Sequence, residues 1–111
     1  MPVRDVSLAN SITTVTNGPT IAVQPFGATE PVELDLRVSA SATGGTPSCT
    51  FDVEGSTTGL GSWTAITTYT IDGFNPYKAQ SFQQIVRVPY VRVNVTAISG
   101  TAATLNVHAN V

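Results

Sequence analysis

The feature that most constrains the fold is a strict alternation of apolar and polar residues in the stretch PVELDLRVSASA, residues 31–42. Every second position from Val32 to Ala40 is apolar, and polar or charged residues from Glu33 to Ser39 occupy the positions between them. Successive side chains of a β-strand point to opposite faces of the sheet. A period of two sustained over this length therefore predicts a strand with one buried face and one solvated face.

Similar strand signals recur along the chain, and the composition favours them. The sequence holds seventeen threonines and fourteen valines, and β-branched residues suit pleated sheets better than helices. Gly, Pro and Asn separate the runs, and no run has the period of an amphipathic helix. We predict an all-β fold, an antiparallel β-sandwich of jelly-roll type with about seven or eight short strands. Trp63 and Ile66 differ in parity along one run, which predicts a β-bulge between them.

The 111 residues suffice for one domain with a single core. The breaker Asn17-Gly18-Pro19 divides residues 1–18, expected to be an extended N-terminal arm or edge strand, from a sandwich domain over residues 19–111. Apolar residues in the first segment follow no clean period, so we predict that they contact a neighbouring subunit. These residues are Val3, Val6, Leu8, Ile12 and Val15.

Low charge limits the classes of partner. Charged residues make up 11% of the chain and the net charge is −2, against about 25% charged residues in a typical domain. A surface of Thr, Ser, Asn and Gln suits a protein packed against neighbours. Clustered cations for nucleic acid are missing, as is an apolar run of membrane-spanning length. We therefore expect neither nucleic acid nor a membrane as a partner, and no signal peptide. Because Cys49 is the only cysteine, we expect synthesis in a reducing cytosol.

The acidic residues form two same-face pairs, Glu33 with Asp35 and Asp52 with Glu54. Such pairs serve glycoside hydrolysis or calcium binding in other proteins. Here their alternation with apolar residues favours the solvated half of a strand. His108 is the only histidine and lies mid-strand, which predicts a polar-face or interface residue. With no acid–base or nucleophilic set in view, we expect no enzyme activity, no metal and no cofactor.

The stretch FDVEGSTTGLGSWTAI, residues 51–66, leads through a Gly- and Thr-rich loop to the only tryptophan. Trp63 is open to two interpretations: an aromatic platform for a sugar, or a core side chain. Because apolar residues of the preceding strand flank the same loop, we predict that Trp63 packs in the core. The full set of predicted core residues is Trp63, Phe51, Val53, Leu36 and Val93.

This stretch and PYVRVNVTAISGTAATLNVHANV, residues 89–111, together resemble small jelly-roll virion proteins of tailed bacteriophages, among them head decoration (cement) proteins. The first matches a strand, a Gly-Ser turn and a tryptophan opening the next strand; the second matches a closing hairpin. The resemblance covers about residues 49–111, with Arg92 and Trp63 at family-like packing positions. The chain also distantly resembles discoidin-like carbohydrate-binding domains, although its Gly, Thr and Ser loops depart from their ligand-binding loops.

The resemblance implies a structural protein of the virion that binds the capsid surface and stabilises contacts between capsomers. It also implies the major capsid protein or other virion subunits as partners, and a homo-oligomer, with a trimer favoured. The alternative is a carbohydrate-binding or adhesion module on a phage tail or cell surface. In that case Trp63, Tyr69 and Tyr77 would contact the ligand.

Overall fold

The computed structural model describes residues 5–110, and this range forms a β-sandwich of two antiparallel sheets without helices. The predicted all-β sandwich is therefore confirmed. Across the same range no helix has the length and apolarity needed to span a membrane. The strands are β1 (Asp5–Ile12), β2 (Thr16–Asn17), β3 (Ile21–Ala22), β4 (Val32–Ser41), β5 (Gly44–Ser56), β6 (Thr64–Asp72), β7 (Tyr77–Val86), β8 (Tyr90–Thr101) and β9 (Thr104–Asn110).

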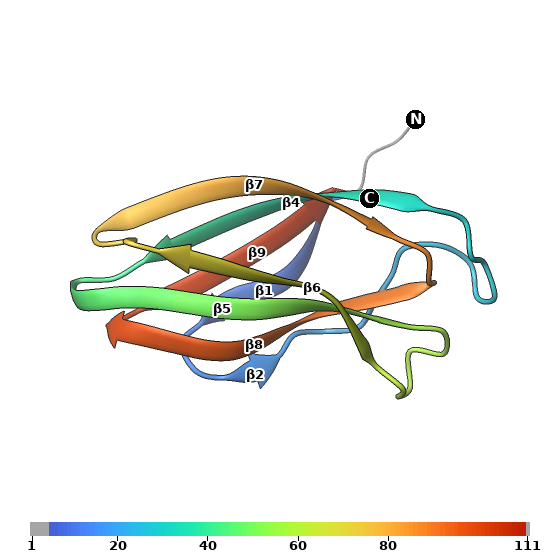
Figure 1. Ribbon diagram of the computed structural model, residues 1–111, viewed down its shortest axis with the longest axis horizontal. Helices are drawn as coiled ribbons and strands as arrows, with labels where there is room; N and C mark the ends of the chain where they lie inside the picture. Colours follow the sequence, from blue (N-terminus) through green and yellow to red (C-terminus); the bar gives the residue numbers. More distant parts are fainter. Residues whose placement is uncertain (1–4, 111) are drawn as a thin grey trace.

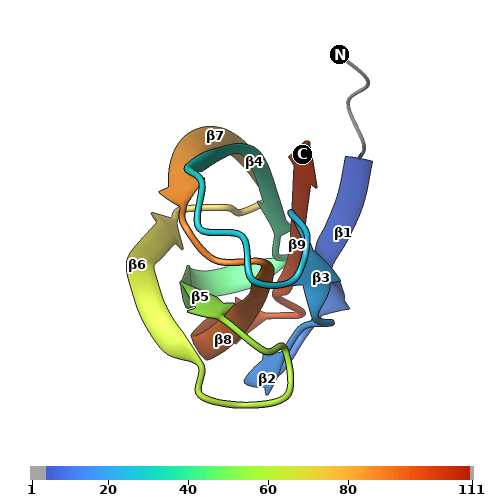
Figure 2. The same cartoon turned by 90° about the vertical axis from the view of Figure 1, so that its right-hand side faces the viewer.

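The strands form two layers, visible end-on in Figure 2. Sheet A has the order β1-β9-β4-β7, and sheet B has the order β2-β8-β5-β6 (Figure 1). The short strand β3 also pairs with β8. Because β2 pairs at residues 94–95 of β8 and β3 pairs at residues 90–91, the two act as one edge strand interrupted between Asn17 and Ile21.

The alternation in residues 32–41 has the predicted consequence. Leu34, Leu36, Val38 and Ala40 of β4 are buried, and the residues between them face outward or are only partly covered. The inward faces of both sheets merge into one hydrophobic core. Four of the predicted core residues, Phe51, Val53, Leu36 and Val93, are fully buried there, which confirms that part of the prediction.

The prediction that Trp63 packs in the core is wrong. Its ring lies beneath the Arg92 guanidinium, 4.4 Å from ring centroid to Cζ, on the outer face of sheet B. The cause is the β-bulge that the sequence predicts: Val53 pairs with Thr67 and the next residue, Glu54, pairs with Ala65. Ile66 is therefore the extra residue of the bulge. Ala65, opposite the outward-facing Glu54, faces outward as well. Trp63, two residues before Ala65, lies on the same outer face.

The end of the Ile66 side chain lies close to Gly55 near the bulge, although Ile66 stays 38% exposed. A Cβ added to Gly55 would lie 2.9 Å from the end of the Ile66 side chain and 2.6 Å from Val88. Gly55 thus leaves room for these two side chains.

The N-terminal segment is an edge strand from residue 5 to residue 12, where β1 pairs with β9. A register shift between Ser7 and Ala9 places two consecutive side chains, Leu8 and Ala9, inside the core. A bulge of this kind explains why the apolar residues show no clean period along the sequence.

The prediction that the apolar residues of this segment contact a neighbouring subunit is wrong for Leu8, whose side chain is 0% exposed. Val6 and Ile12 are partly buried and pack against the chain's own core. Val15 is 61% exposed and is not part of the core. Val3 lies outside the described residues.

The residues after β1 cross from sheet A to sheet B and close that side of the sandwich. The N–H of Gly18 donates a hydrogen bond of 2.7 Å to the Val93 carbonyl oxygen. A Cβ on Gly18 would collide with the Leu8 carbonyl oxygen, so only glycine permits this approach of the two backbones. Residues 5–18 are therefore built into the sandwich.

Candidate functional site: the loop end of the sandwich

Three connections gather at one end of the molecule, on the right in Figure 1 and facing the viewer in Figure 2. Residues 23–31 join β3 to β4, residues 57–63 join β5 to β6, and residues 87–89 join β7 to β8. The three segments together hold only two charged residues, Glu30 and Arg87, of opposite sign. We call this surface the loop end.

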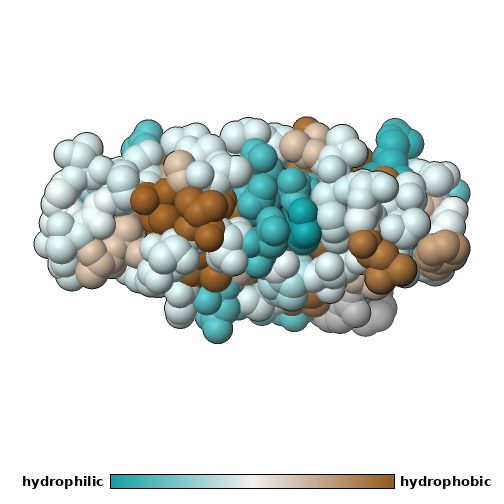
Figure 3. Space-filling model, turned by 90° about the horizontal axis from the view of Figure 1, so that it is seen from below, coloured by the Kyte–Doolittle hydropathy of each residue, from teal (hydrophilic) through white to brown (hydrophobic). Residues whose placement is uncertain are grey.

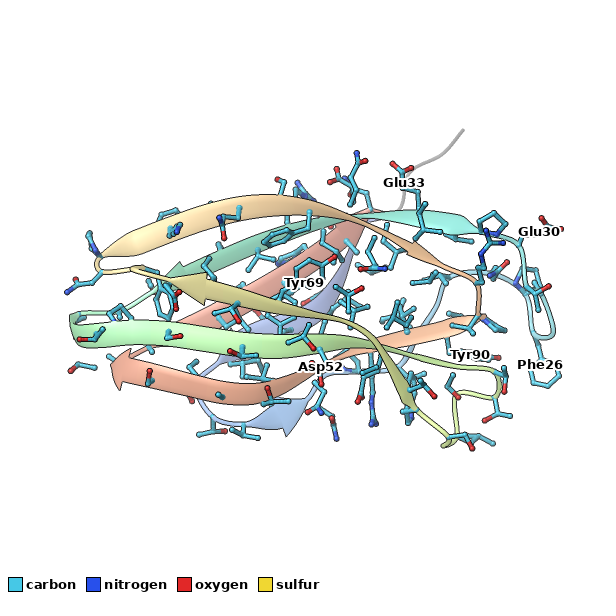
Figure 4. The ribbon with its side chains drawn as sticks, in the orientation of Figure 1. Phe26, Glu30, Glu33, Asp52, Tyr69 and Tyr90 are labelled. Atoms are coloured by element: carbon cyan, nitrogen blue, oxygen red, sulfur yellow. The ribbon has the colours of Figure 1, made fainter. Side chains whose placement is uncertain are left out.

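Two of these connections carry a large apolar side chain at the tip. Phe26 is 73% exposed and Leu60 is 95% exposed. Figure 4 places Phe26 at the extreme end of the molecule, on the same connection as Glu30. Single exposed apolar residues are ordinary on protein surfaces, but two at the tips of neighbouring loops form an apolar end that water solvates poorly.

The loop of Leu60 is held in place by Ser56. The Ser56 hydroxyl donates to the Gly61 carbonyl oxygen at 2.6 Å and accepts from the N–H groups of Thr58 at 3.2 Å and Gly59 at 3.0 Å. Gly59 has a φ of +74° and lies so close to the Tyr90 ring that a Cβ would be 3.0 Å from it. The loop thus packs down on Tyr90, and the Leu60 side chain points away from it into solvent.

The loop of Phe26 is tied to its neighbours in a similar way. Gln24 Nε2 donates to the carbonyl oxygens of Glu30 at 2.9 Å and Val88 at 3.2 Å. The Ala28 N–H donates to the Pro25 carbonyl oxygen at 3.0 Å, and Gly27 at φ +84° supplies the positive φ that position i+2 of a type II turn requires. Phe26 occupies position i+1 of that turn, where its ring projects outward.

Neither apolar tip was among the residues singled out from the sequence. The signal for both is a large apolar residue between turn-forming residues, Pro25-Phe26-Gly27 and Gly59-Leu60-Gly61. Such a residue sits where the chain reverses at the surface, so its exposure is a consequence of the turn itself.

The outer face of sheet B carries the acidic pair Asp52 and Glu54 with polar partners. Arg92 Nε donates to Glu54 Oε1 at 2.7 Å, and Asp52 Oδ1 accepts from Thr68 Oγ1 at 2.6 Å. Figure 3 views the molecule from this side and shows a hydrophilic cluster in mid-face, with hydrophobic atoms both toward the loop end and, over a larger area, on the opposite side of the cluster. Each acidic group of this pair has a partner on a neighbouring strand, as expected for the solvated half of β5.

Glu33 and Asp35 likewise occupy the outward half of β4, and Figure 4 shows Glu33 pointing away from the sandwich. His108 lies on the outward half of β9 with its side chain 42% exposed, which confirms its prediction as a polar-face residue. Among residues 5–110 no three His, Cys, Asp or Glu side chains are grouped so as to hold a metal ion.

The thiol of Cys49 is buried in the core, and this burial raises its pKa to about 11. The nucleophilic form of cysteine is the thiolate. At neutral pH the group is therefore protonated and inert.

The three aromatic residues proposed for a glycan site do not come together. Trp63 is covered by Arg92 on sheet B. Tyr69 lies between the sheets, where its ring centroid is 4.5 Å from that of Phe82 and its hydroxyl donates to Gln84 Oε1 at 2.7 Å; burial raises its pKa. Only Tyr77 is freely exposed, at 62%.

Comparison of the chain with protein-family models, with curated proteins and with solved structures found no match in any of the three.

Proposed function

We propose that this protein is a structural virion protein of a tailed bacteriophage, a head decoration (cement) protein that attaches to the capsid surface through its loop end. The observation that carries the attachment site is the pair of exposed apolar tips, Phe26 and Leu60, on two braced neighbouring loops. The choice of a phage capsid as the partner rests on the resemblance of residues 49–111 to small virion proteins.

The order of the strands supports this resemblance. When β2 and β3 are counted as one interrupted strand, the chain has eight strands in the orders first-eighth-third-sixth and second-seventh-fourth-fifth. A jelly roll likewise divides eight antiparallel strands between two packed sheets, so this arrangement supports the proposal. The fold type implied by the resemblance is thus compatible with the topology.

The physical chemistry of the loop end favours docking on another protein. Burying a Leu or Phe side chain contributes about 1.5–3 kcal/mol relative to leaving it exposed. Because hydrogen bonds hold both loops in one conformation, binding would cost little ordering entropy. The segments hold only one cation and one anion, so few charges would lose water in the contact.

The oligomeric state expected from the resemblance is a trimer. Light scattering of the purified protein would then give three times the 11.6 kDa mass of one chain. A mass of one chain would remove the trimer from the proposal without affecting the attachment site.

Attachment is tested with capsids of the parent phage assembled without this protein. We expect the Phe26→Ser, Leu60→Ser double variant to co-sediment at least about 100-fold more weakly than the unmodified protein, because each lost apolar contact costs about tenfold or more. Its melting temperature should be unchanged, since neither side chain packs in the core.

Val15→Ser is the matched control, because Val15 is a similarly exposed apolar residue outside the three connections of the loop end. We expect this variant to bind as tightly as the unmodified chain. Equal binding by the double variant would exclude the loop end as the attachment site, and no binding by the unmodified chain would exclude the decoration function.

A further inference from the structure

The outer face of sheet A contains a groove of about 490 Å³, remote from the loop-end tips and independent of the proposed function. Its two ends differ in chemistry. Tyr77 lies at one end, and Arg37, His108 and Asp5 line the other. We propose that this groove is a binding site for a neutral oligosaccharide.

The floor of the groove is made of small side chains on two paired strands. Ser81 of β7 lies opposite Arg37 of β4, Ala79 lies opposite Ser39, and Tyr77 lies opposite Ser41. All of these positions belong to the outward half of their strands. Small residues between larger ones at both ends leave a trough that follows the direction of the strands.

The length of the trough fits a chain of sugars better than one sugar ring. Arg37 and Ser41 are four residues apart on β4, which corresponds to about 13 Å along a strand. Tyr77 stands beside Ser41 and the polar group stands beside Arg37. A ligand that contacts both ends must therefore extend along β4 and β7.

The polar end offers donors and acceptors with no excess of charge. Arg37 Nη2 lies 3.0 Å from Asp5 Oδ1, and His108 Nδ1 lies 3.8 Å from the same oxygen. The side chains of Arg37 and Asp5 remain 50% and 56% exposed, so their outer atoms stay within reach of a ligand. A guanidinium and a carboxylate side by side can donate to one hydroxyl and accept from its neighbour.

The aromatic end supplies the apolar contact that a sugar ring requires. The Tyr77 ring is 62% exposed and can cover the C–H face of a pyranose, while serine hydroxyls of the floor reach the polar rim of the ring. Because the charges of Arg37 and Asp5 cancel, the site gives no advantage to an anion. These features together favour a ligand with many hydroxyls, apolar ring faces and no charge.

The test is a titration of the ¹⁵N-labelled full chain, followed by the positions of its amide signals. The neutral probes are cellotetraose, maltotetraose, chitotetraose and mannotetraose, and 6′-sialyllactose is the anionic probe. We expect saturable shifts with at least one neutral probe, centred on Ser39, Ala79 and Ser81. Shifts only with sialyllactose, shifts centred elsewhere, or no shifts with any probe would overturn the proposal.

Variants then test the two ends of the groove. Tyr77→Ala should weaken binding by about tenfold or more, whereas Tyr77→Phe should retain it because the ring remains. Arg37→Lys keeps the charge but loses the planar set of donors, so we expect clearly weaker binding.

Ile85→Ala is the matched control, because Ile85 is also exposed on the outward half of β7 and does not line the groove. We expect it to bind the probe as the unmodified chain does. Unchanged affinity of Tyr77→Ala, or an equal loss in Ile85→Ala, would contradict the groove as the site.

Discussion

At the scale of single residues, one extra residue in a strand moves Trp63 from the core face of the sheet to its outer face. Alternate residues of a strand face opposite sides of the sheet. The extra residue at Ile66 exchanges the two faces for the residues that precede it. Trp63 consequently packs against Arg92, the cation of the ion pair with Glu54, on the outer face of sheet B and does not fill the core. Its contribution to stability should be that of a surface contact between a ring and a guanidinium.

We expect Trp63→Ala to lower the free energy of unfolding by about 1–2 kcal/mol, in the range of a cation–π contact with some loss of packing. Urea unfolding of Trp63→Ala, Arg92→Ala and the double variant would measure the coupling, expected at about 0.5–1 kcal/mol. A loss of about 3–5 kcal/mol for Trp63→Ala alone, as for a buried aromatic residue, would contradict the surface position.

The buried thiol makes a prediction about pH. Burial raises the pKa of Cys49 from 9.0 to about 11 in the folded chain, so between these values the unfolded chain releases a proton that the folded chain retains. Stability should therefore be fully present below pH 9 and fall as the pH rises toward 11. Thermal melting across this interval should show a shallower fall for Cys49→Ala than for the unmodified chain. Identical slopes would show that another group causes the loss.

At the scale of elements, the strands with clean alternation and the bulge at the start of β6 were predictable, but the bulge in β1 was not. The period of two in residues 32–41 identifies β4 and its buried face, and β9 follows the same rule with Leu105, Val107 and Ala109 buried. In β1, the register shift puts Leu8 and Ala9 on the same side. The apolar residues of β1 follow no period that would locate this shift, because it depends on the pairing of β1 with β9.

The edge strand β1 is predicted to be essential to the fold. Leu8→Ala removes a fully buried side chain from the core and should lower the free energy of unfolding by about 2–5 kcal/mol. Val15→Ala, in the same N-terminal segment but exposed, should change it by less than about 0.5 kcal/mol. Denaturant unfolding of both variants measures the difference. If the two variants had equal stability, β1 would have to be a detachable arm.

At the scale of the whole molecule, the sandwich could be predicted because β-branched residues and alternating runs occur along most of the chain and indicate strands throughout it. The loop end could not be predicted, because its two tips belong to connections that lie far apart in the sequence, residues 23–31 and 57–63. The turn residues around Phe26 and Leu60 indicate exposure at each tip separately. Only the packing of the strands places the two tips on one surface.

Photo-cross-linking tests the proposal that the loop end contacts the capsid. A photoreactive amino acid is introduced in place of Leu60 in one preparation and in place of Val15 in another. Each is bound to capsids assembled without this protein, irradiated and analysed by mass spectrometry. We predict adducts between position 60 and a capsid subunit, and none from position 15. Adducts from position 15 alone, with none from position 60, would contradict the claim.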